Sequence, residues 1–432
     1  MVFVLDCERQ PLDPCHPARA RKLLKKGRAA VYRTYPFTII LKDRTAAESL
    51  THDHRLKLDP GSKTTGIAIV QEQTERVVFA AELSQRGQAI RDALLARRAI
   101  RRNRRSRHTR YRKPRFLNRR RPDGWLAPSL DHRVQTTMTW VRRLMRLYPL
   151  RALSMELVKF DTQLMENAEI AGVQYQQGEL AGYEIREYLL EKWGRKCAYC
   201  GKTGVPLQVE HLVPRVRGGS DRVSNLALAC EECNQKKGKR TASEYGFGHL
   251  MQAARQPLKD AAAVTSVRWA LWRLLCALGL PLETSSGGRT KFNRSRLGWE
   301  KAHWRDAACV GASTSDTLTA ATSSVLHIAA KGHGSRQMCG TNASGFPVRH
   351  RSRQKWFFGV QTGDLVRAVV PTGKRQGTHT GRVLVRAAGW FDITTKQGRQ
   401  AGIGYRYCCI IQRADGYAYG LKPLKHSASS QA

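Results

Sequence analysis

The chain has 432 residues, and its 75 lysines and arginines outweigh 34 aspartates and glutamates to give a formal net charge of +41. A folded core needs no such charge and is weakened by the self-repulsion that comes with it. The charge therefore indicates a polyanionic partner, most simply nucleic acid held by its phosphates. The length is enough for two to four domains.

The composition argues against a membrane-spanning or secreted protein. The best apolar run, residues 269–282, is shorter than a membrane span and is interrupted by Arg273. The first ten residues lack the basic start and long apolar run of a signal peptide. Four of the eleven cysteines stand at metal-binding spacing, which is typical of a reducing compartment. We therefore expect an intracellular, cytoplasmic protein without a membrane partner.

The first 85 residues predict short strands around one basic helix. We expect strands at 2–5 and 37–41, with a helix that Pro17 opens and Gly27 ends. Further strands are expected at 56–59, 66–70 and 77–82. Asp59 ends the first of these at an Asp-Pro-Gly turn. Glycines there let a backbone or phosphate come close, which suits a metal ligand, although the same tripeptide is common in ordinary turns.

Residues 86–121 hold sixteen lysines and arginines and a single acid, Asp92. Ile90 and Leu94 predict a helix whose first turns pack on protein, after which arginines lie on every face. A helix that is basic all round needs phosphates on several sides, and arginine favours a bidentate grip on them. A disordered tail is less consistent with a position between strands of one domain. We expect nucleic-acid contacts from Arg97, Arg98, Arg101, Arg102, Arg104, Arg105, Arg107, Arg110 and Arg112.

The middle of the chain predicts a helix at 131–147 and a short strand at 153–157. The strand carries Glu156. An acid within an apolar strand is costly unless a cation partners it, and a metal ion is the obvious cation. A further helix, expected at 180–193, leads into the cysteine-containing segment.

Residues 197–238 contain two Cys-x-x-C pairs. Four thiolates at this spacing match a tetrahedral structural zinc, which would hold together a segment too small to build its own core. The expected ligands are Cys197, Cys200, Cys230 and Cys233. A zinc ribbon without any catalysis would show the same four cysteines.

A Glu-His dipeptide and two asparagines lie between or beside these pairs. His211 can take a proton from water. Glu210 and Asn234 offer the oxygen ligands that magnesium prefers, and Asn225 can hold the imidazole by a hydrogen bond. Together they resemble the HNH nuclease motif, a two-stranded ribbon and helix that hold one divalent ion against a phosphodiester.

Beyond this segment, residues 261–278 predict a helix with Trp269, Trp272 and Leu275 in the core, and residues 285–296 predict a loop. His303 and Asp306 follow, and their spacing of three places them on one helix face. Together with Asp59 and Glu156 they give four candidate ligands for two magnesium ions.

The order of these blocks resembles the IscB family of transposon-encoded, RNA-guided DNA endonucleases, forerunners of the type II CRISPR effector nuclease. In that family a RuvC-type, RNase H-like nuclease is split into three pieces. An arginine-rich bridge helix follows the first piece, and the HNH domain lies between the second and third. The family's Pro-Leu-Met-Pro signature reads Pro11-Leu12-Asp13-Pro14 here.

The resemblance implies a multidomain α/β fold with a split RuvC core and a zinc-clipped ββα-metal HNH domain inserted into it. The implied division is an N-terminal module at 1–54, RuvC parts at 55–85, 122–189 and 246–330, the bridge helix at 86–121, the HNH domain at 190–245 and a C-terminal domain at 331–432. Short β runs at 364–370, 381–385 and 405–412 predict that this last domain is a small, barrel-like β structure. The family places guide-RNA contacts and recognition of a target-adjacent motif there.

The resemblance also implies the chemistry. A structured guide RNA would pair with double-stranded DNA beside an adjacent motif, and the enzyme would make a double-strand break. The HNH site, with one magnesium ion, would cut the guide-paired strand. The RuvC site, with two, would cut the displaced strand, and the zinc would be structural. A monomeric ribonucleoprotein is the simplest assembly, and it would be associated with the prokaryotic nucleoid.

Two alternatives stay open. One is an RNA-independent HNH or RuvC nuclease, such as a homing endonuclease or a junction resolvase. The arginine helix within the nuclease fold disfavours it. The other is a non-catalytic RNA- or DNA-binding protein, which the joint presence of Asp59, Glu156, His211 and Asp306 disfavours.

Overall fold

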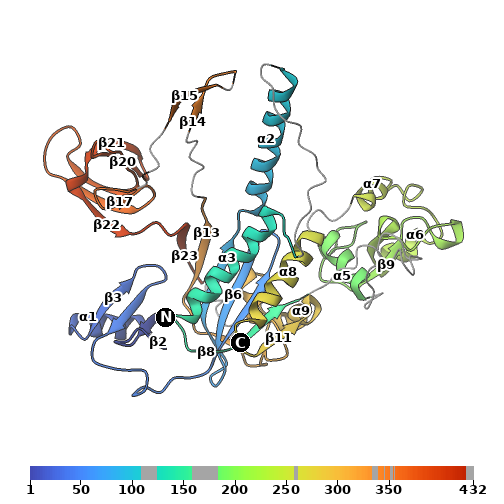
Figure 1. Cartoon of the computed structure of the whole chain (residues 1–432). Coiled ribbons are helices and arrows are strands. Elements are labelled where there is room, and N and C mark those ends of the chain that lie inside the picture. Colours follow the sequence, from blue (N-terminus) through green and yellow to red (C-terminus); the bar gives the residue numbers. More distant parts are fainter. Residues whose placement is uncertain are drawn as a thin grey trace.

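The computed structural model describes residues 1–108, 124–157, 183–256, 261–332, 339–344, 346–350, 354 and 356–424. The chain forms several separate units around one large mixed sheet (Figure 1). Among the described residues, no helix is both long and apolar enough to cross a membrane.

The central sheet has eight strands in the order β11-β8-β5-β6-β7-β13-β23, with the short β12 pairing β7. Strands β5, β6 and β7 form an antiparallel meander, while β8 runs parallel to β5, and β13 runs parallel to β7. The bounds are β5 His54–Pro60, β6 Thr64–Gln71, β7 Arg76–Ser84, β8 Leu150–Glu156, β11 Leu282–Ser285, β12 Thr319–Ala320, β13 Ser324–Ala330 and β23 Tyr417–Pro423.

Helices cover both faces of this sheet because its middle strands are apolar on both faces. On one face, Ile67 and Ile69 of β6 belong to the main core with residues of α3 and α8. On the other face, Ala68 and Val70 form a second core with α10. The helices are α3 Pro128–Met145, α8 Ala261–Cys276, α9 Gly287–Arg296 and α10 His303–Ala308.

Two expectations for this region are wrong in detail. Residues 287–296, expected as a loop, form α9, because the Ser286 hydroxyl caps the helix by accepting from the backbone N–H of Arg289 at 3.3 Å. In α8 the fully buried residues are Leu271 and Leu275, whereas the tryptophans at 269 and 272 are half-buried. The predicted strand that carries Glu156 and the hairpin that carries Asp59 are confirmed.

The predicted arginine helix is confirmed as α2, Gly87–Ser106. It projects from the central sheet toward the hairpin β14–β15, Cys339–Thr341 and Pro347–His350 (Figure 1). Residues 95–108 are all exposed among the described parts of the chain, including the apolar side chains of Leu95 and Ile100. The Arg107 guanidinium donates to the Ala343 carbonyl at 3.0 Å and so connects the end of the helix to the hairpin.

The N-terminal module is a four-stranded sheet in the order β2-β1-β4-β3 with one helix. Pro17 occupies the first turn of that helix and the His16 ring caps it, as the sequence indicates. Asp415 connects this module to the central sheet, because its carboxylate contacts both Arg33 and Arg143. The bounds are β1 Val2–Leu5, β2 Pro11–Cys15, α1 Pro17–Lys25, β3 Ala29–Arg33 and β4 Thr38–Leu41.

The cysteine-containing segment folds as a separate ββα unit, in which β9 and β10 pair antiparallel and α6 follows. Its core also includes Leu189 of α5 and Leu250 of α7, so the unit is wider than the predicted range of 190–245. The bounds are α5 Tyr183–Lys192, β9 Leu207–His211, β10 Leu226–Cys230, α6 Glu231–Lys237 and α7 His249–Arg255.

The C-terminal region contains a five-stranded antiparallel sheet in the order β21-β20-β19-β18-β22. The described strand pairings leave this sheet open, and barrel-like closure stays a prediction. The boundary expected at 331–432 needs one correction, because β23 pairs with β13 and so returns to the central sheet. The remaining strands are β16 Trp356–Phe357, β17 Val360–Gln361, β18 Leu365–Val370, β19 Gly377–Leu384, β20 Trp390–Thr395, β21 Gly398–Gly404 and β22 Cys408–Gln412.

Candidate active sites

The four ligands expected to converge do share one cavity. A cavity of about 320 Å³ at the carboxyl ends of β5 and β8 is lined by Asp59, Glu156, His303 and Asp306. Asp59 lies near the end of β5, and Glu156 ends the parallel neighbour β8, so the two acids meet at the carboxyl ends of adjacent strands. His303 and Asp306 lie on α10, as their spacing predicted.

Gly66 explains why α10 comes so close to Asp59. In the β5–β6 pair Gly66 lies opposite Asp59, and a Cβ at Gly66 would lie 1.9 Å from the carbonyl oxygen of His303. Any larger residue would therefore push the helix away. On the sheet face under α10, position 66 is glycine and position 68 is alanine. These small residues let α10 lie close to the sheet, which brings Asp306 near the acids.

Two arginines lie among the acids. The Arg268 guanidinium, from α8, donates from Nη2 to Glu156 Oε1 at 2.8 Å, and the same nitrogen is 3.7 Å from Asp59 Oδ1. Arg294, from α9, pairs through Nε with Asp306 Oδ1 at 2.7 Å. Both guanidiniums are largely buried, with 8% and 14% of their side chains exposed. Neither arginine was singled out from the sequence.

Burial and crowding raise the proton affinity of the acids. The pKa of Asp59 is raised well above its ordinary value by burial and then by the negative charge of Glu156, against the opposing effect of Arg268. Burial also raises the pKa of Asp306, which Arg294 counteracts. A cation between these carboxylates would offset their repulsion and stabilise their ionised forms.

Asp59, Glu156 and Asp306 offer the oxygen ligands that a hard divalent cation takes. Arginines occupy the space between these acids here, and no three of the four predicted ligands have their ligand atoms within 4.8 Å of one another. Glu156 and Asp59 already contact one positively charged nitrogen in common. Gly287 leaves room around Glu156, since a Cβ there would lie 3.2 Å from Oε1. Lys291 and Lys301 also line the cavity, so a phosphate would find positive charge beside the acids.

A buried network that the sequence analysis missed fixes the end of α10. Lys57, two residues before Asp59 on the same face of β5, donates to the Val310 carbonyl at 2.9 Å and to the Thr314 hydroxyl at 3.0 Å. Asn293 of α9 donates to the carbonyls of Cys309 and Gly311. Burial lowers the pKa of Lys57 to about 8.

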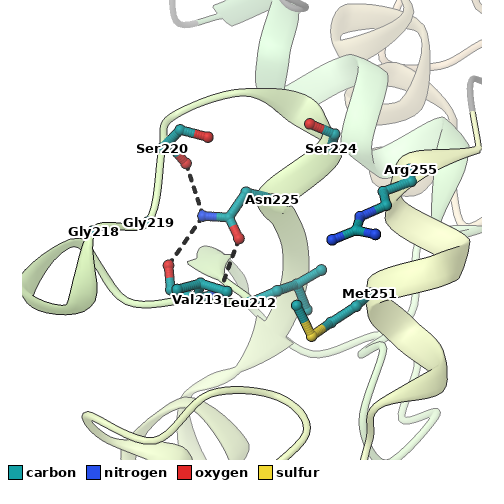
Figure 2. A pocket seen from close by; sticks show the side chains of 9 residues that line it. All are labelled: Leu212, Val213, Gly218, Gly219, Ser220, Ser224, Asn225, Met251 and Arg255. Carbon is teal, nitrogen blue, oxygen red and sulfur yellow. Dashed lines mark hydrogen bonds between the residues drawn. The ribbon is translucent and has the colours of Figure 1, made fainter.

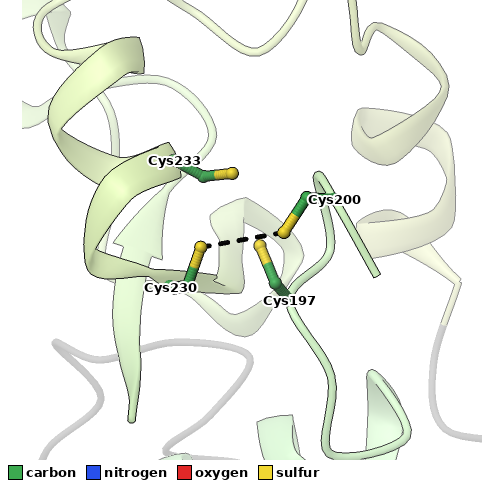
Figure 3. Close-up of side chains that lie close together, drawn as sticks. All are labelled: Cys197, Cys200, Cys230 and Cys233. Atoms are coloured by element: carbon green, nitrogen blue, oxygen red, sulfur yellow. Dashed lines mark hydrogen bonds between the residues drawn. The ribbon is translucent and has the colours of Figure 1, made fainter. Parts of the chain in front are cut away.

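The four cysteines converge as expected (Figure 3). Their sulfurs all lie within 4.8 Å of one another, and within the described part of the chain they are the one group of three or more histidine, cysteine or acidic side chains that meets this limit. The Cys200 and Cys230 sulfurs are 3.7 Å apart. Burial opposes ionisation of Cys197, but backbone hydrogen bonds from Cys200, Cys230 and Tyr199 outweigh it and lower the pKa of this thiol to about 7. This all-sulfur donor set fits a closed zinc site.

Glu210, a predicted magnesium ligand, is buried in an ion pair. Its Oε1 is 2.5 Å from Lys237 Nζ, and its Oε2 accepts a hydrogen bond from the Tyr199 hydroxyl at 2.6 Å. Lys237 also donates to the His211 carbonyl at 2.8 Å. Through Tyr199 and Lys237, Glu210 thus links the segment between Cys197 and Cys200 to the backbone of His211. The side-chain amide of the other predicted ligand, Asn234, donates to Gln208 Oε1 at 2.7 Å.

The partner of the His211 imidazole is Asp221, which the sequence analysis missed. His211 Nε2 is 2.7 Å from Asp221 Oδ1, and Arg215 donates to both oxygens of the same carboxylate. Hydrogen bonds from Arg215 and then from His211 lower the pKa of Asp221 to about 2, so this group is ionised at neutral pH. The remaining ring nitrogen, Nδ1, is the one left to accept a proton.

The expectation that Asn225 holds the imidazole is therefore wrong. The Asn225 side chain instead accepts from the Val213 N–H and donates to the carbonyls of Val213 and Ser220 (Figure 2). These bonds close the loop that carries Asp221, so Asn225 acts on His211 only through the loop. Asn225 also lines a cavity of about 230 Å³ beside α7, into which Arg255 points (Figure 2).

The arginines of α2 lie where the sequence placed them. Arg97, Arg98, Arg101, Arg102, Arg104, Arg105 and Arg107 are all exposed. Arg110 and Arg112 lie outside the described residues. The exposed arginines lie on several sides of the second half of the helix, which suits phosphate contacts.

Comparison with known proteins gives two family matches. Residues 2–178 match the model of the RRXRR protein family, and residues 197–240 match that of the HNH endonuclease family. No curated protein sequence matches the chain.

Solved structures with detectable likeness include Cas9 of Streptococcus thermophilus in complex with the GGAA PAM, at 13% identity and a TM-score of 0.24, covering 60% of this chain and 32% of that one. Type II-C Cas9 from Actinomyces naeslundii is another, at 16% identity and a TM-score of 0.16, covering 42% and 31%. This chain thus spans about a third of the length of these proteins.

The HNH match covers the four cysteines, His211 and both asparagines, and it confirms that this segment is an HNH endonuclease domain. The RRXRR match covers the N-terminal module, the Asp59 hairpin and the arginine helix. The chain therefore joins an RRXRR region to an HNH endonuclease domain, which is the composition of a nuclease.

Proposed function

We propose that the chain is an RNA-guided DNA endonuclease of the IscB type, with a RuvC-type site in the acidic cavity and a second site in the HNH domain. The observation that carries the proposal is the convergence of Asp59, Glu156, His303 and Asp306 in one cavity. These residues come from three chain segments, and the HNH domain lies between the second and third segments.

The acidic cavity supports metal-assisted phosphodiester hydrolysis. Divalent ions held there would lower the pKa of a bound water and stabilise the leaving oxygen. The chain itself supplies the rest of the site. Asp59 and Glu156 are placed by adjacent strands, α10 is fixed at its end by Lys57 and Asn293, and Lys291 and Lys301 offer positive charge to a phosphate. We assign this site to the displaced DNA strand.

In the HNH domain, His211 is the general base. The Asp221 carboxylate accepts a hydrogen bond from Nε2–H and fixes the ring, which leaves Nδ1 to take a proton from the attacking water. Glu210 and Asn234 stay the proposed magnesium ligands. To bind an ion, the Glu210 carboxylate has to break its ion pair with Lys237 or its hydrogen bond with Tyr199. The four cysteines would hold a structural zinc, and the site is assigned to the guide-paired strand.

The arginine helix is the proposed bridge helix and the main RNA contact. Its exposed length presents arginines on several sides, which suits a structured RNA that surrounds it. The net charge of +41 requires many phosphates nearby. Sequence specificity would come from pairing between guide RNA and target DNA, with the protein reading backbone shape and a short adjacent motif. A cytoplasmic ribonucleoprotein containing one copy of the chain is the simplest assembly.

The test is strand-resolved cleavage. The protein, purified with the RNA from its native flanking DNA, is given a target duplex with a different label on each strand. His211→Ala should cut only the displaced strand, and Asp59→Ala only the guide-paired strand. A single variant that still cuts both strands contradicts the assignment of sites. Cutting by nucleic-acid-free protein contradicts RNA guidance.

A further inference from the structure

One arginine stands where the proposed nuclease needs a metal ion. Arg268 reaches from α8 into the acidic cavity, and its side chain is 8% exposed. The same nitrogen, Nη2, is 2.8 Å from Glu156 Oε1 and 3.7 Å from Asp59 Oδ1. A positive charge therefore lies between the two acids that come from adjacent parallel strands.

The fold holds this guanidinium in place. Arg268 Nε donates to the carbonyl of Pro60 at 3.0 Å, and Pro60 directly follows Asp59 on β5. On the other side of Arg268, its helix is anchored in the main core by Val267, Leu271 and Leu275. The side chain is thus fixed both at its base and at its tip, which a mobile surface arginine is not.

The two carboxylates beside Arg268 need a positive counter-charge. Two carboxylates at neighbouring strand ends repel one another, and burying them without a counter-charge is costly. Arginine keeps its charge throughout the physiological pH range, so this side chain cannot leave the pair by losing a proton. Only displacement of the guanidinium would free both carboxylates for another cation.

We propose that Arg268 is an internal counter-ion that fills the space between Asp59 and Glu156 until divalent ions bind. This inference rests on the proposed metal-dependent function of the cavity. It makes Arg268 a positioning residue with two opposing effects. It holds the acids in place in the metal-free protein, and it competes with the metal for the same oxygens. Arg268 thereby sets the metal concentration at which this site becomes active.

The chain offers a matched control. Arg296, on the last turn of α9, also pairs with a carboxylate, that of Asp316. Asp316 is 71% exposed, and neither residue lines the acidic cavity. Arg296→Gln removes the same charge as Arg268→Gln from the same region of the chain, but not from between the proposed ligands.

The experiment measures Mn²⁺ binding to the full-length protein by calorimetry, after nucleic acid has been removed at high salt. The binding that Asp59→Asn abolishes defines the cavity site. Arg268→Gln should bind Mn²⁺ at this site at least about tenfold more tightly than the wild type, because an opposite charge at this distance lowers the proton affinity of a carboxylate by about one to three orders of magnitude, and a metal cation competes with the guanidinium for the same oxygens. Arg268→Lys should lie between them, and Arg296→Gln should match the wild type.

A second readout does not depend on activity. In buffer freed of divalent ions other than the bound zinc, Arg268→Gln should unfold at a lower temperature than the wild type, and Mn²⁺ should raise its Tm more. Mn²⁺ affinity that is unchanged or weaker in both Arg268 variants overturns the counter-ion role alone. If Asp59→Asn removes no Mn²⁺ binding, the proposed metal site itself fails. If Arg268→Gln does not fold, Arg268→Lys decides between these outcomes.

Discussion

The closest approach in the proposed RuvC-type site is between Gly66 and α10, and it gives a sharp prediction. In Gly66→Ala the new Cβ would start 1.9 Å from the His303 carbonyl oxygen, whereas real Cβ contacts are essentially never under 3.0 Å. The helix therefore has to move by about 1 Å, since the sheet beneath it is close-packed. His303 and Asp306 move with it, away from Asp59 and Glu156.

A shift of about 1 Å in a catalytic group can reduce the rate about 100-fold. We therefore expect Gly66→Ala to slow cleavage of the displaced strand by about two orders of magnitude. Cleavage of the guide-paired strand should be unchanged, because the HNH domain has its own core. Overpacking of this kind costs about 1–3 kcal/mol of stability, which leaves the protein folded.

The assay is single-turnover cleavage of a duplex labelled differently on each strand. Gly420→Ala is the matched control, because Gly420 lies in the same sheet on β23 and a Cβ there would meet only ordinary contact, 3.9 Å from His327 Cβ. Equal cleavage of the displaced strand by wild type and Gly66→Ala would refute the claim that α10 carries part of this site. A parallel loss in Gly420→Ala would refute the claim that the effect is local.

Three further predictions concern stability. Glu210→Ala leaves Lys237 as an unpaired buried charge, so it should lower the free energy of unfolding of the HNH domain by about 3–5 kcal/mol, while His211→Ala should change it little; equal stability of the two variants in denaturant titrations would show that Glu210 has no structural role. Removal of zinc by a chelator should open residues 183–255 to proteolysis while the central sheet stays protected, because a small metal-held domain folds with its ion; a protected HNH domain after chelation would contradict the zinc assignment. Since the pKa of Asp59 is raised in the folded state, the contribution of Asp59 to stability without divalent ions is fully present below the ordinary carboxyl pKa and is lost as pH rises through the raised value, so the difference in Tm between wild type and Asp59→Asn should change with pH over this range; a difference that is the same at every pH would contradict the burial of an ionisable Asp59.

Most of the local structure could be predicted from the sequence because it follows local rules. The strand that carries Glu156 and the hairpin that carries Asp59 lie within a few residues of their predicted bounds. The arginine helix begins where it was predicted and is described as far as Ser106, while residues 109–121 of its predicted range lie outside the described residues. The four cysteines could be assigned to one site by spacing alone. The spacing of His303 and Asp306 was enough to place both on one helix.

Most failures at the site arise from contacts that only the folded chain creates. Asp221 is ten residues from His211, and only the folded loop between the two strands brings them together. Asn225 has the right chemistry to bind an imidazole, but backbone groups of its own loop satisfy its amide first. Arg268 is one of two arginines in a largely apolar helix, and nothing in the local pattern links it to Asp59 and Glu156.

The account depends most on metal binding between acids that are far apart in sequence. A crystal of the full-length protein soaked with Mn²⁺ tests it directly by anomalous scattering at the manganese edge. The account predicts a peak about 2.2 Å from oxygens of Asp59 and Glu156, with the Arg268 guanidinium moved out of the space between them. A cavity with no anomalous peak, and with Arg268 still bound to Glu156 at saturating Mn²⁺, would contradict it.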